Sequence, residues 1–133
     1  METQDILKLD IGTKDKATLK PAKVKIVAIQ IKDKTNDGKE MKTPLAEIMC
    51  KHPERDELLP ITKVKIERAG KLEVVSTWVQ TEEEEGKQVL SKNCALSVLM
   101  KHLSVTNLEL LYNKEVETIE QSKENQYLCI KAY

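Results

Sequence analysis

The stretch Lys23-Val-Lys-Ile-Val-Ala-Ile-Gln-Ile31 alternates apolar and polar side chains, but the phase of the alternation slips once along it. The first half places Val24 and Ile26 on one face of an extended chain. From Val27 onward the apolar side chains change face and continue to Ile31. Successive side chains of a strand point to opposite faces, so a slip of one residue in a β-branched run is typical of a bulge or a sharp bend. The stretch therefore predicts a long, bent first strand.

Turn residues and prolines divide the chain after this strand. Residues 32–43 contain Thr35-Asn-Asp-Gly38, which predicts a turn. Residues 45–51 predict a second strand. Residues 52–60 are bounded by prolines and predict a loop or a single helical turn.

Residues 61–79 carry the pattern of a β-hairpin. Val64 and Ile66 alternate with Lys63 and Lys65, a turn follows at residues 69–71, and residues 72–79 return. In the returning strand, Leu72, Val74, Ser76 and Trp78 share one phase, which predicts a packing role for Trp78 on the apolar side. The acidic residues 82–86 predict a solvated turn.

The hydrophobic period changes to a helical one over residues 91–102. Leu96, Leu99, Met100 and Leu103 recur at helical spacing after Ser91 or Asn93, which are both suitable N-caps. Thr106 predicts the start of a second short turn, and Asn113 is suited to the left-handed conformation that ends it. Residues 114–120 and 127–132 predict two closing strands around the polar turn 122–126.

Composition restricts the class of protein. The chain has 133 residues, 40% of them hydrophobic and 3% aromatic with no Phe, and its 22 basic and 22 acidic side chains cancel. These values predict one ordinary globular domain with no global electrostatic attraction to nucleic acid or to an anionic membrane.

Three widely spaced cysteines argue against a disulfide framework. The lack of a long apolar run argues against a membrane span, and we expect a cytoplasmic protein.

The order of elements predicts a mainly β fold, namely a small five-stranded OB-like barrel with one inserted α-helix. Another small barrel or an α+β sandwich is the alternative. We expect residues 1–20 to be a flexible N-terminal arm or an edge strand, and residues 21–133 to form the single OB-like domain.

The last third of the chain supplies a resemblance. The pattern Ser97-x-Leu-Met-x-His-Leu-Ser-Val-Thr-x-Leu108, then Asn113-Lys-Glu-Val-Glu-Thr118 and Tyr127-Leu-Cys-Ile130, resembles the helix and closing strands of short phage and archaeal OB-fold proteins associated with single-stranded DNA. Where those proteins often carry Gly before the Lys-x-Val strand, this chain has Asn113. The resemblance implies an OB-fold and binding of single-stranded nucleic acid.

Lysines and aromatic residues form the candidate binding set. The tetrapeptide Lys-Val-Lys-Ile occurs at residues 23–26 and again at residues 63–66. Lysines that follow a phosphate backbone, together with aromatic rings on which bases stack, are what single-strand binding requires. The predicted nucleic-acid-binding residues are Lys23, Lys25, Lys63, Lys65, Arg68, Trp78, Tyr127 and Lys131. The alternative is that these lysines are ordinary solvated residues of exposed strands.

Other kinds of site have weaker patterns. Cys50, His52, Glu54, Asp56 and Glu57 include metal-ligand residue types, but no regular spacing brings three of them to one point, so we expect a charged loop and no metal. His102 has no Cys or acidic partner at helical spacing, and we expect a solvent-facing or hydrogen-bonded histidine and not a metal ligand. No nucleophile elbow, phosphate-binding glycine loop or dinucleotide fingerprint is present, so we expect no enzymatic activity and no cofactor.

The sequence thus predicts a non-enzymatic module that binds single-stranded nucleic acid, with a replication or repair accessory as the expected role. The rival from another class is a protein interaction module or homo-oligomer that pairs through a strand edge or through the apolar helix face at Leu99 and Met100. A small-ligand barrel is a third class, and it would need an internal cavity.

Overall fold

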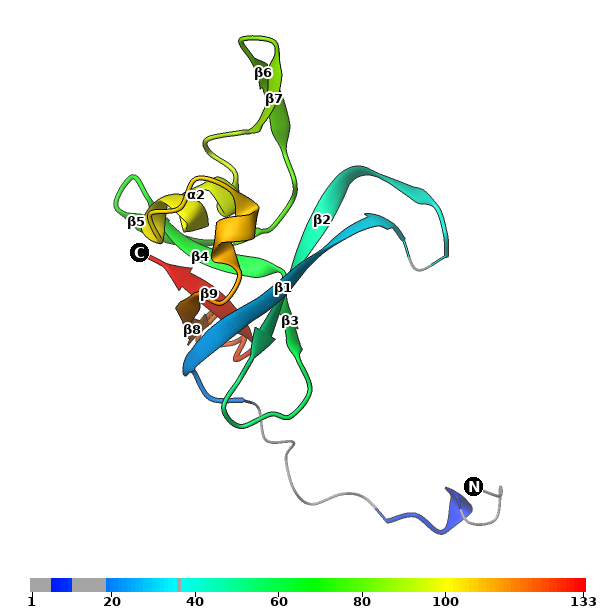
Figure 1. Cartoon of the computed structure of the whole chain (residues 1–133). Coiled ribbons are helices and arrows are strands. Elements are labelled where there is room, and N and C mark those ends of the chain that lie inside the picture. Colours follow the sequence, from blue (N-terminus) through cyan, green and yellow to red (C-terminus); the bar gives the residue numbers. More distant parts are fainter. Residues whose placement is uncertain (1–5, 11–18, 36) are drawn as a thin grey trace.

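The computed structural model describes residues 6–10, 19–35 and 37–133 (Figure 1). The predicted arm therefore lies mostly outside the described residues, which include 6–10, 19 and 20 of it. Ile6 and Leu7 lie in a helical turn, and the backbone N–H of Leu9 donates to the carbonyl of Ile6 at 3.2 Å.

Seven strands form one mixed sheet, with the spatial order β3-β2-β1-β8-β9-β4-β5. Neighbouring strands are antiparallel except β4 and β9, which are parallel. The predicted mainly β class is confirmed. The strands are β1 (Lys23–Lys34), β2 (Glu40–Lys51), β3 (Leu59–Ile61), β4 (Lys63–Arg68), β5 (Lys71–Ser76), β8 (Glu115–Glu120) and β9 (Leu128–Ala132).

The first strand contains the predicted irregularity. The register of β1 against β2 shifts between Ile26 and Ala28, at the point where the hydrophobic phase slips in the sequence. Before the shift β1 also pairs with β8, and beyond it β1 pairs only with β2. β1 therefore pairs with both β2 and β8 at its start, and with β2 alone after the bend. Both strands run farther toward the 35–39 turn than the hydrophobic pattern predicts, because β1 and β2 continue to pair after their side chains become exposed (Figure 1).

The ladder of paired strands ends at β3 on one side and at β5 on the other, so it is not a closed barrel. Two features bring its ends near each other. A single residue, Thr62, separates β3 from β4. In addition, the segment after β5 bonds to β2: the N–H of Ala46 donates to the carbonyl of Thr77 at 2.9 Å, and the N–H of Val79 donates to the carbonyl of Pro44 at 2.8 Å.

The helical segment lies between β5 and β8 in the chain. Helix α2 (Ala95–His102) begins after Cys94, which takes the N-cap position in place of the predicted Ser91 or Asn93. The 3-10 helix η1 (Leu108–Leu111) is capped by Asn107, whose side chain accepts a hydrogen bond from the N–H of Leu110, and not by Thr106. Asn113 has a φ of 68°, which confirms the predicted left-handed conformation.

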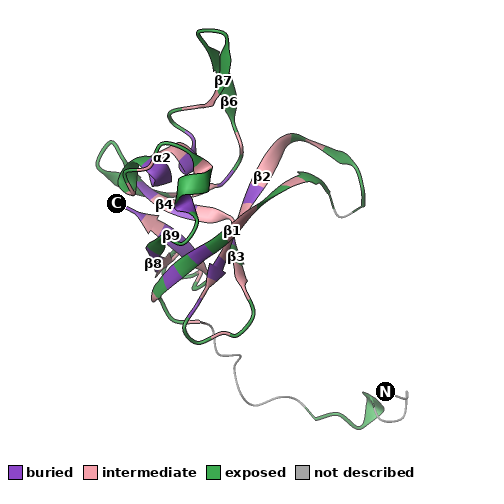
Figure 2. Cartoon of the chain, viewed as in Figure 1, coloured by how far each residue is buried: buried purple, intermediate pink, exposed green. Residues whose placement is uncertain are grey.

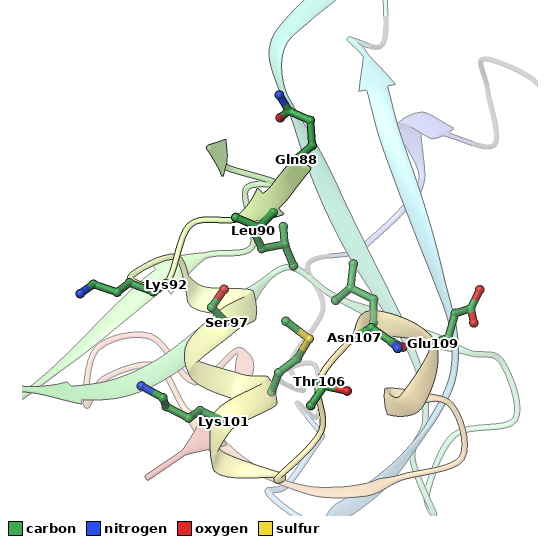
Figure 3. A pocket seen from close by; sticks show the side chains of 11 residues that line it. Gln88, Leu90, Lys92, Ser97, Lys101, Thr106, Asn107 and Glu109 are labelled. Carbon is green, nitrogen blue, oxygen red and sulfur yellow. The ribbon is translucent and has the colours of Figure 1, made fainter. Parts of the chain in front are cut away.

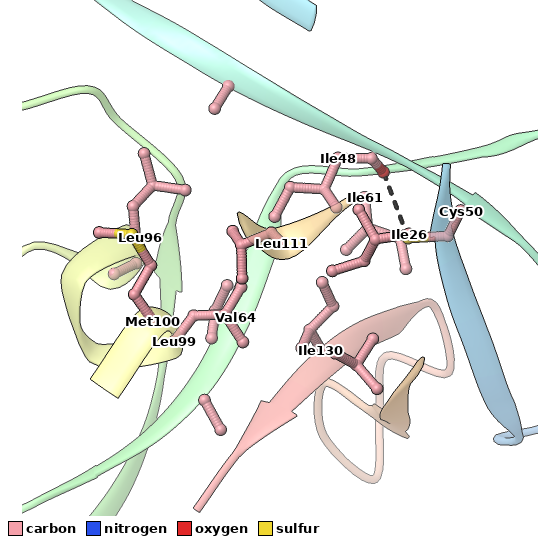
Figure 4. Packing of buried hydrophobic residues seen from close by; sticks show 14 of the residues in the cluster. Ile26, Ile48, Cys50, Ile61, Val64, Leu96, Leu99, Met100, Leu111 and Ile130 are labelled. Carbon is pink, nitrogen blue, oxygen red and sulfur yellow. Dashed lines mark hydrogen bonds between the residues drawn. The ribbon is translucent and has the colours of Figure 1, made fainter. Parts of the chain in front are cut away.

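The core lies between the inner face of the sheet and the apolar faces of α2 and η1 (Figures 2 and 4). Leu99 is 0% exposed and Met100 is 7% exposed. Both residues belong to the core cluster, so they do not form a free apolar face on the helix, although the accessible part of Met100 lines a groove beside α2. Fully buried members from the sheet include Ile26, Ile48, Val64, Ile66 and Ile130.

The acidic segment forms a second, separate hairpin rather than a simple turn. Strand β6 (Thr81–Glu84) pairs with β7 (Lys87–Leu90), and the two form their own two-stranded sheet, which projects from the body (Figure 1). Glu85 and Gly86 both have positive φ, at 51° and 78°. This is the conformation that a tight two-residue hairpin turn requires.

The phase predicted for the returning strand is wrong. In the pairing of β4 with β5, the partners of the buried Val64 and Ile66 are Val75 and Glu73. The inward phase therefore continues to Thr77, which is fully buried, and Trp78 lies on the other phase with 37% of its surface exposed.

Among the described residues, no helix is long and apolar enough to cross a membrane.

Candidate functional site

The two predicted lysines of β1, Lys23 and Lys25, each face a glutamate of β8. Lys23 is the register partner of Glu117, and Lys25 is the partner of Glu115. Directly opposed residues of paired strands share a face of the sheet, so these glutamates lie on the same face as the lysines. On its other side, Lys25 is opposed by Lys51 of β2. The positive charge of β1 is therefore largely balanced where it meets β8.

The lysines of β4 share this outer face, but two strands separate them from β1. β8 and β9 lie between β1 and β4, and Lys65 is the register partner of Lys131 on β9. Lys131 in turn lies 3.6 Å from Glu117 and places its ammonium 4.9 Å from the ring centroid of Tyr133. Across the sheet, the negative charge of Glu117 thus lies between the positive charges of Lys23 and Lys131, and Lys65 follows Lys131 as a second positive charge.

Arg68 and Trp78 lie apart from the remaining predicted residues. Arg68 forms an ion pair with Glu73 at 3.1 Å and donates to the carbonyl of Asn93 at 2.7 Å. Both bonds hold it at the turn end of the β4–β5 hairpin. Trp78 forms an isolated antiparallel β-bridge with Leu45 of β2. Its side chain lines a small hollow together with Lys42, away from the other predicted residues.

Tyr127 is the most exposed large hydrophobic residue of the domain, with 73% of its surface accessible, and it borders a cavity of about 330 Å³. We call this cavity and its rim the Tyr127 hollow. It lies where the start of β4 meets the turn between β8 and β9. Two of its lining residues are cationic and none is acidic. The full set of lining residues is Leu19, Arg55, Leu59, Pro60, Ile61, Thr62, Lys63, Gln121, Gln126, Tyr127 and Leu128.

Lys63 lines this hollow and Lys65 bonds to one of its lining residues, and both lysines donate to neutral partners. The ammonium of Lys63 donates to the hydroxyl of Ser76 at 2.7 Å. The ammonium of Lys65 donates to the backbone carbonyl of Gln121, a lining residue, at 3.3 Å. Because neither partner is a carboxylate, both positive charges remain available to an anion. The structure thus brings Lys63, Lys65 and Tyr127 together.

Arg55 is a lining residue that the sequence did not single out. It lies among Glu54, Asp56 and Glu57, which makes the loop appear acidic, and its guanidinium is 3.8 Å from Glu57. Both side chains of this pair are at least one-third exposed, so the pair is weak. The only signal in the sequence is a single Arg between two prolines.

The loop that carries Arg55 is fixed by a buried histidine. His52 is 0% exposed, its Nδ1 accepts the N–H of Glu54 at 3.1 Å, and its Nε2 is 2.8 Å from the carbonyl of Lys20. A nitrogen that accepts carries no proton, so the proton resides on Nε2 and is donated to Lys20. The carbonyl of His52 also accepts the N–H of Arg55 at 3.2 Å. His52, which the sequence places in a charged loop, therefore anchors that loop through these hydrogen bonds.

Two cysteines near this face, Cys50 and Cys129, are free and buried. Burial raises the pKa of Cys129, an effect that the ammonium of Lys65 partly opposes. Burial raises the pKa of Cys50 to about 12. Protonated thiols are poor nucleophiles and poor metal ligands, so neither group suits covalent chemistry. His102 is exposed, as predicted. Within the described part of the chain, no three His, Cys, Asp or Glu residues are grouped as metal ligands.

Searches against protein-family models, curated proteins and solved structures found no significant match.

Proposed function

We propose that residues 21–133 form an OB-like module that binds single-stranded nucleic acid at the Tyr127 hollow and catalyses no reaction. The observation that carries this proposal is the juxtaposition of an exposed Tyr127 ring with two cations, Arg55 and Lys63, on a surface without an acidic lining residue.

The strand connections support an OB-like interpretation. If β3 and β4 are taken as two halves of one strand interrupted at Thr62, the pairs run from β1 to β2, to β3 and β4, to β9, to β8 and back to β1. Such a ring has five strands, and α2 lies between its third strand and its fourth in chain order. This is the arrangement expected of an OB-like barrel with one inserted helix.

The chemistry of the hollow suits a flexible polyanion with aromatic bases. A base stacked on an exposed aromatic ring contributes about 1–3 kcal/mol. Arg55, Lys63 and Lys65 can contact neighbouring phosphates. Duplex DNA would not present its bases to Tyr127, so a single strand is the better match.

The neutral net charge limits the strength of this binding. With 22 basic and 22 acidic side chains, long-range attraction contributes little and the local cluster has to supply the affinity. We therefore propose moderate, sequence-tolerant binding. The three cysteines are free and buried, which accords with a reducing compartment such as the cytoplasm.

A fluorescence anisotropy titration of labelled oligo-dT tests the proposal. We expect binding at tens of micromolar protein or below in low salt. Neutralisation of about three phosphates predicts a slope of about −2 for log K against log salt concentration. No binding in this range, or binding that is indifferent to salt, would exclude the proposal.

Matched variants locate the site. Tyr127→Ala should weaken binding by about tenfold, whereas Tyr127→Phe, which keeps the ring, should bind like the parent. Lys63→Glu should weaken binding and flatten the salt dependence. Lys71→Glu makes the same charge change at an exposed position of β5 and should have a much smaller effect. Equal losses for the two lysine variants would show that net charge, and not this hollow, governs binding.

A further inference from the structure

A larger groove lies on another part of the domain, between β7, α2 and η1 (Figure 3). We call it the α2 groove. Its volume is about 750 Å³, and its apolar lining residues are Val89, Leu90, Met100 and Leu108. A groove of this size is within the range that holds several side chains of a ligand.

Charged residues border the α2 groove on opposite sides. Lys92 and Lys101 extend from one side and Glu109 extends from the other (Figure 3). The two lysines are exposed, and neither forms a salt bridge with another described residue. A suitable occupant therefore has an apolar centre, an acidic group for the lysines and a basic group for Glu109.

Residues 6–10 of this chain have that chemistry. Ile6, Leu7 and Leu9 are 53%, 78% and 62% exposed, so three apolar side chains in a stretch of four residues are uncovered. Lys8 and Asp10, in the same short segment, supply one charge of each sign and are also exposed. Contiguous exposed apolar residues usually mark a contact surface.

We propose that the segment Ile6–Asp10 of one copy of the protein docks into the α2 groove of a second copy. Ile6, Leu7 and Leu9 cover the apolar lining, while Asp10 meets Lys92 and Lys101. Lys8 meets Glu109. When each of two copies donates its segment to the other, the two contacts are identical and the assembly closes as a symmetric dimer.

The contact surface is small, so we expect a weak dimer. Small interfaces are typical of transient associations, and we expect a dissociation constant in the micromolar to millimolar range. The dimer does not depend on nucleic acid, because the Tyr127 hollow and the α2 groove share no lining residue.

Sedimentation equilibrium of the full chain over about 1 µM to 1 mM tests the proposal. The weight-average mass should rise with concentration toward twice the 15.2 kDa of one chain. The segment variant Leu7→Asp/Leu9→Asp should weaken dimerisation by at least about tenfold, and so should the groove variant Lys92→Glu/Lys101→Glu. All four positions are exposed, so the fold should tolerate these changes. A parent chain that stays monomeric throughout, or variants that dimerise like the parent, would overturn the proposal.

A mixing experiment separates this docking from other modes of dimerisation. The segment variant keeps its groove intact, and the groove variant keeps its segment intact. Neither should dimerise alone, but an equimolar mixture should form a heterodimer through the one remaining contact. Because this heterodimer keeps one of the two contacts, it should form at higher concentrations than the parent dimer. A mixture that associates no more strongly than either variant alone would contradict docking of the segment into the groove. Lys71→Glu serves as the control for charge reversal and should dimerise like the parent.

Discussion

Truncation of Leu99 to alanine provides the most direct test of how the domain is held together. Leu99 lies in the middle of α2 and is 0% exposed, in the cluster that also contains Leu96 and Met100 (Figure 4). Leu99→Ala removes three carbon atoms, a loss of about 2.5 kcal/mol in transfer free energy. The unfilled cavity raises the expected cost to about 3–5 kcal/mol, out of a total stability of about 5–15 kcal/mol.

Urea denaturation followed by circular dichroism measures this effect. We expect the midpoint of the Leu99→Ala variant to fall markedly while the slope of free energy against denaturant remains unchanged. In a thermal scan the melting temperature should fall by about 10–15 °C. Leu110→Ala is a matched control because it removes the same atoms from η1, where Leu110 is 48% exposed. It should cost about 1 kcal/mol or less.

A cost below about 1 kcal/mol for Leu99→Ala, or equal costs for both leucines, would refute the assignment of Leu99 to the core. An interface residue would behave differently, since its loss would change the association of the protein without lowering the stability of the monomer. Sedimentation of the same variant distinguishes these outcomes. We expect no change in its association at concentrations where it remains folded.

Three further predictions concern single sites. His52→Phe should destabilise the domain by about 2–5 kcal/mol in urea denaturation, because the carbonyl of Lys20 and the N–H of Glu54 both lose their partner; a neutral result would contradict the anchoring role. Burial raises the pKa of Cys50 from 9.0 to about 12, so above pH 9 the unfolded chain loses a proton that the folded chain keeps. The free energy of unfolding should then fall by about 1.4 kcal/mol per pH unit between those values, and Cys50→Ala should show a correspondingly shallower decline. Ala69 has a φ of 52° in the β4–β5 turn, so Ala69→Asn should stabilise the domain by about 0.5–1 kcal/mol, and a lower urea midpoint would contradict this.

The two proposed surfaces differ in what they offer a partner. The Tyr127 hollow combines an exposed ring with cations, whereas the α2 groove combines an apolar lining with charges of both signs. Salt therefore separates them experimentally. Binding of oligo-dT should weaken steeply as salt is added, while a dimer held largely by apolar contacts should respond much less.

Local patterns in the sequence are enough to predict the elements that depend on local physics. The phase slip within residues 23–31 predicts the bend of β1, because side-chain alternation is a property of the strand itself. Asn113 and the 69–71 turn are predicted for the same reason, since positive φ depends on the residue and its immediate neighbours. The apolar spacing of Leu96, Leu99 and Met100 likewise predicts the buried face of α2.

Tertiary structure decided where these elements meet and therefore which charges act together. The two Lys-Val-Lys-Ile strands look equivalent in sequence, but Lys23 and Lys25 face glutamates of β8, whereas Lys63 and Lys65 bond to neutral groups. The alternation of residues 72–78 predicts the wrong face for Trp78, because the pairing of β5 with β4 sets which side of the strand is inward. Arg55 lines the same hollow as Tyr127, and the loop that carries Arg55 is held by the hydrogen bond between His52 and Lys20, which are 32 residues apart. Such contacts depend on strand register and loop anchoring between remote residues, and a local pattern carries no information about them.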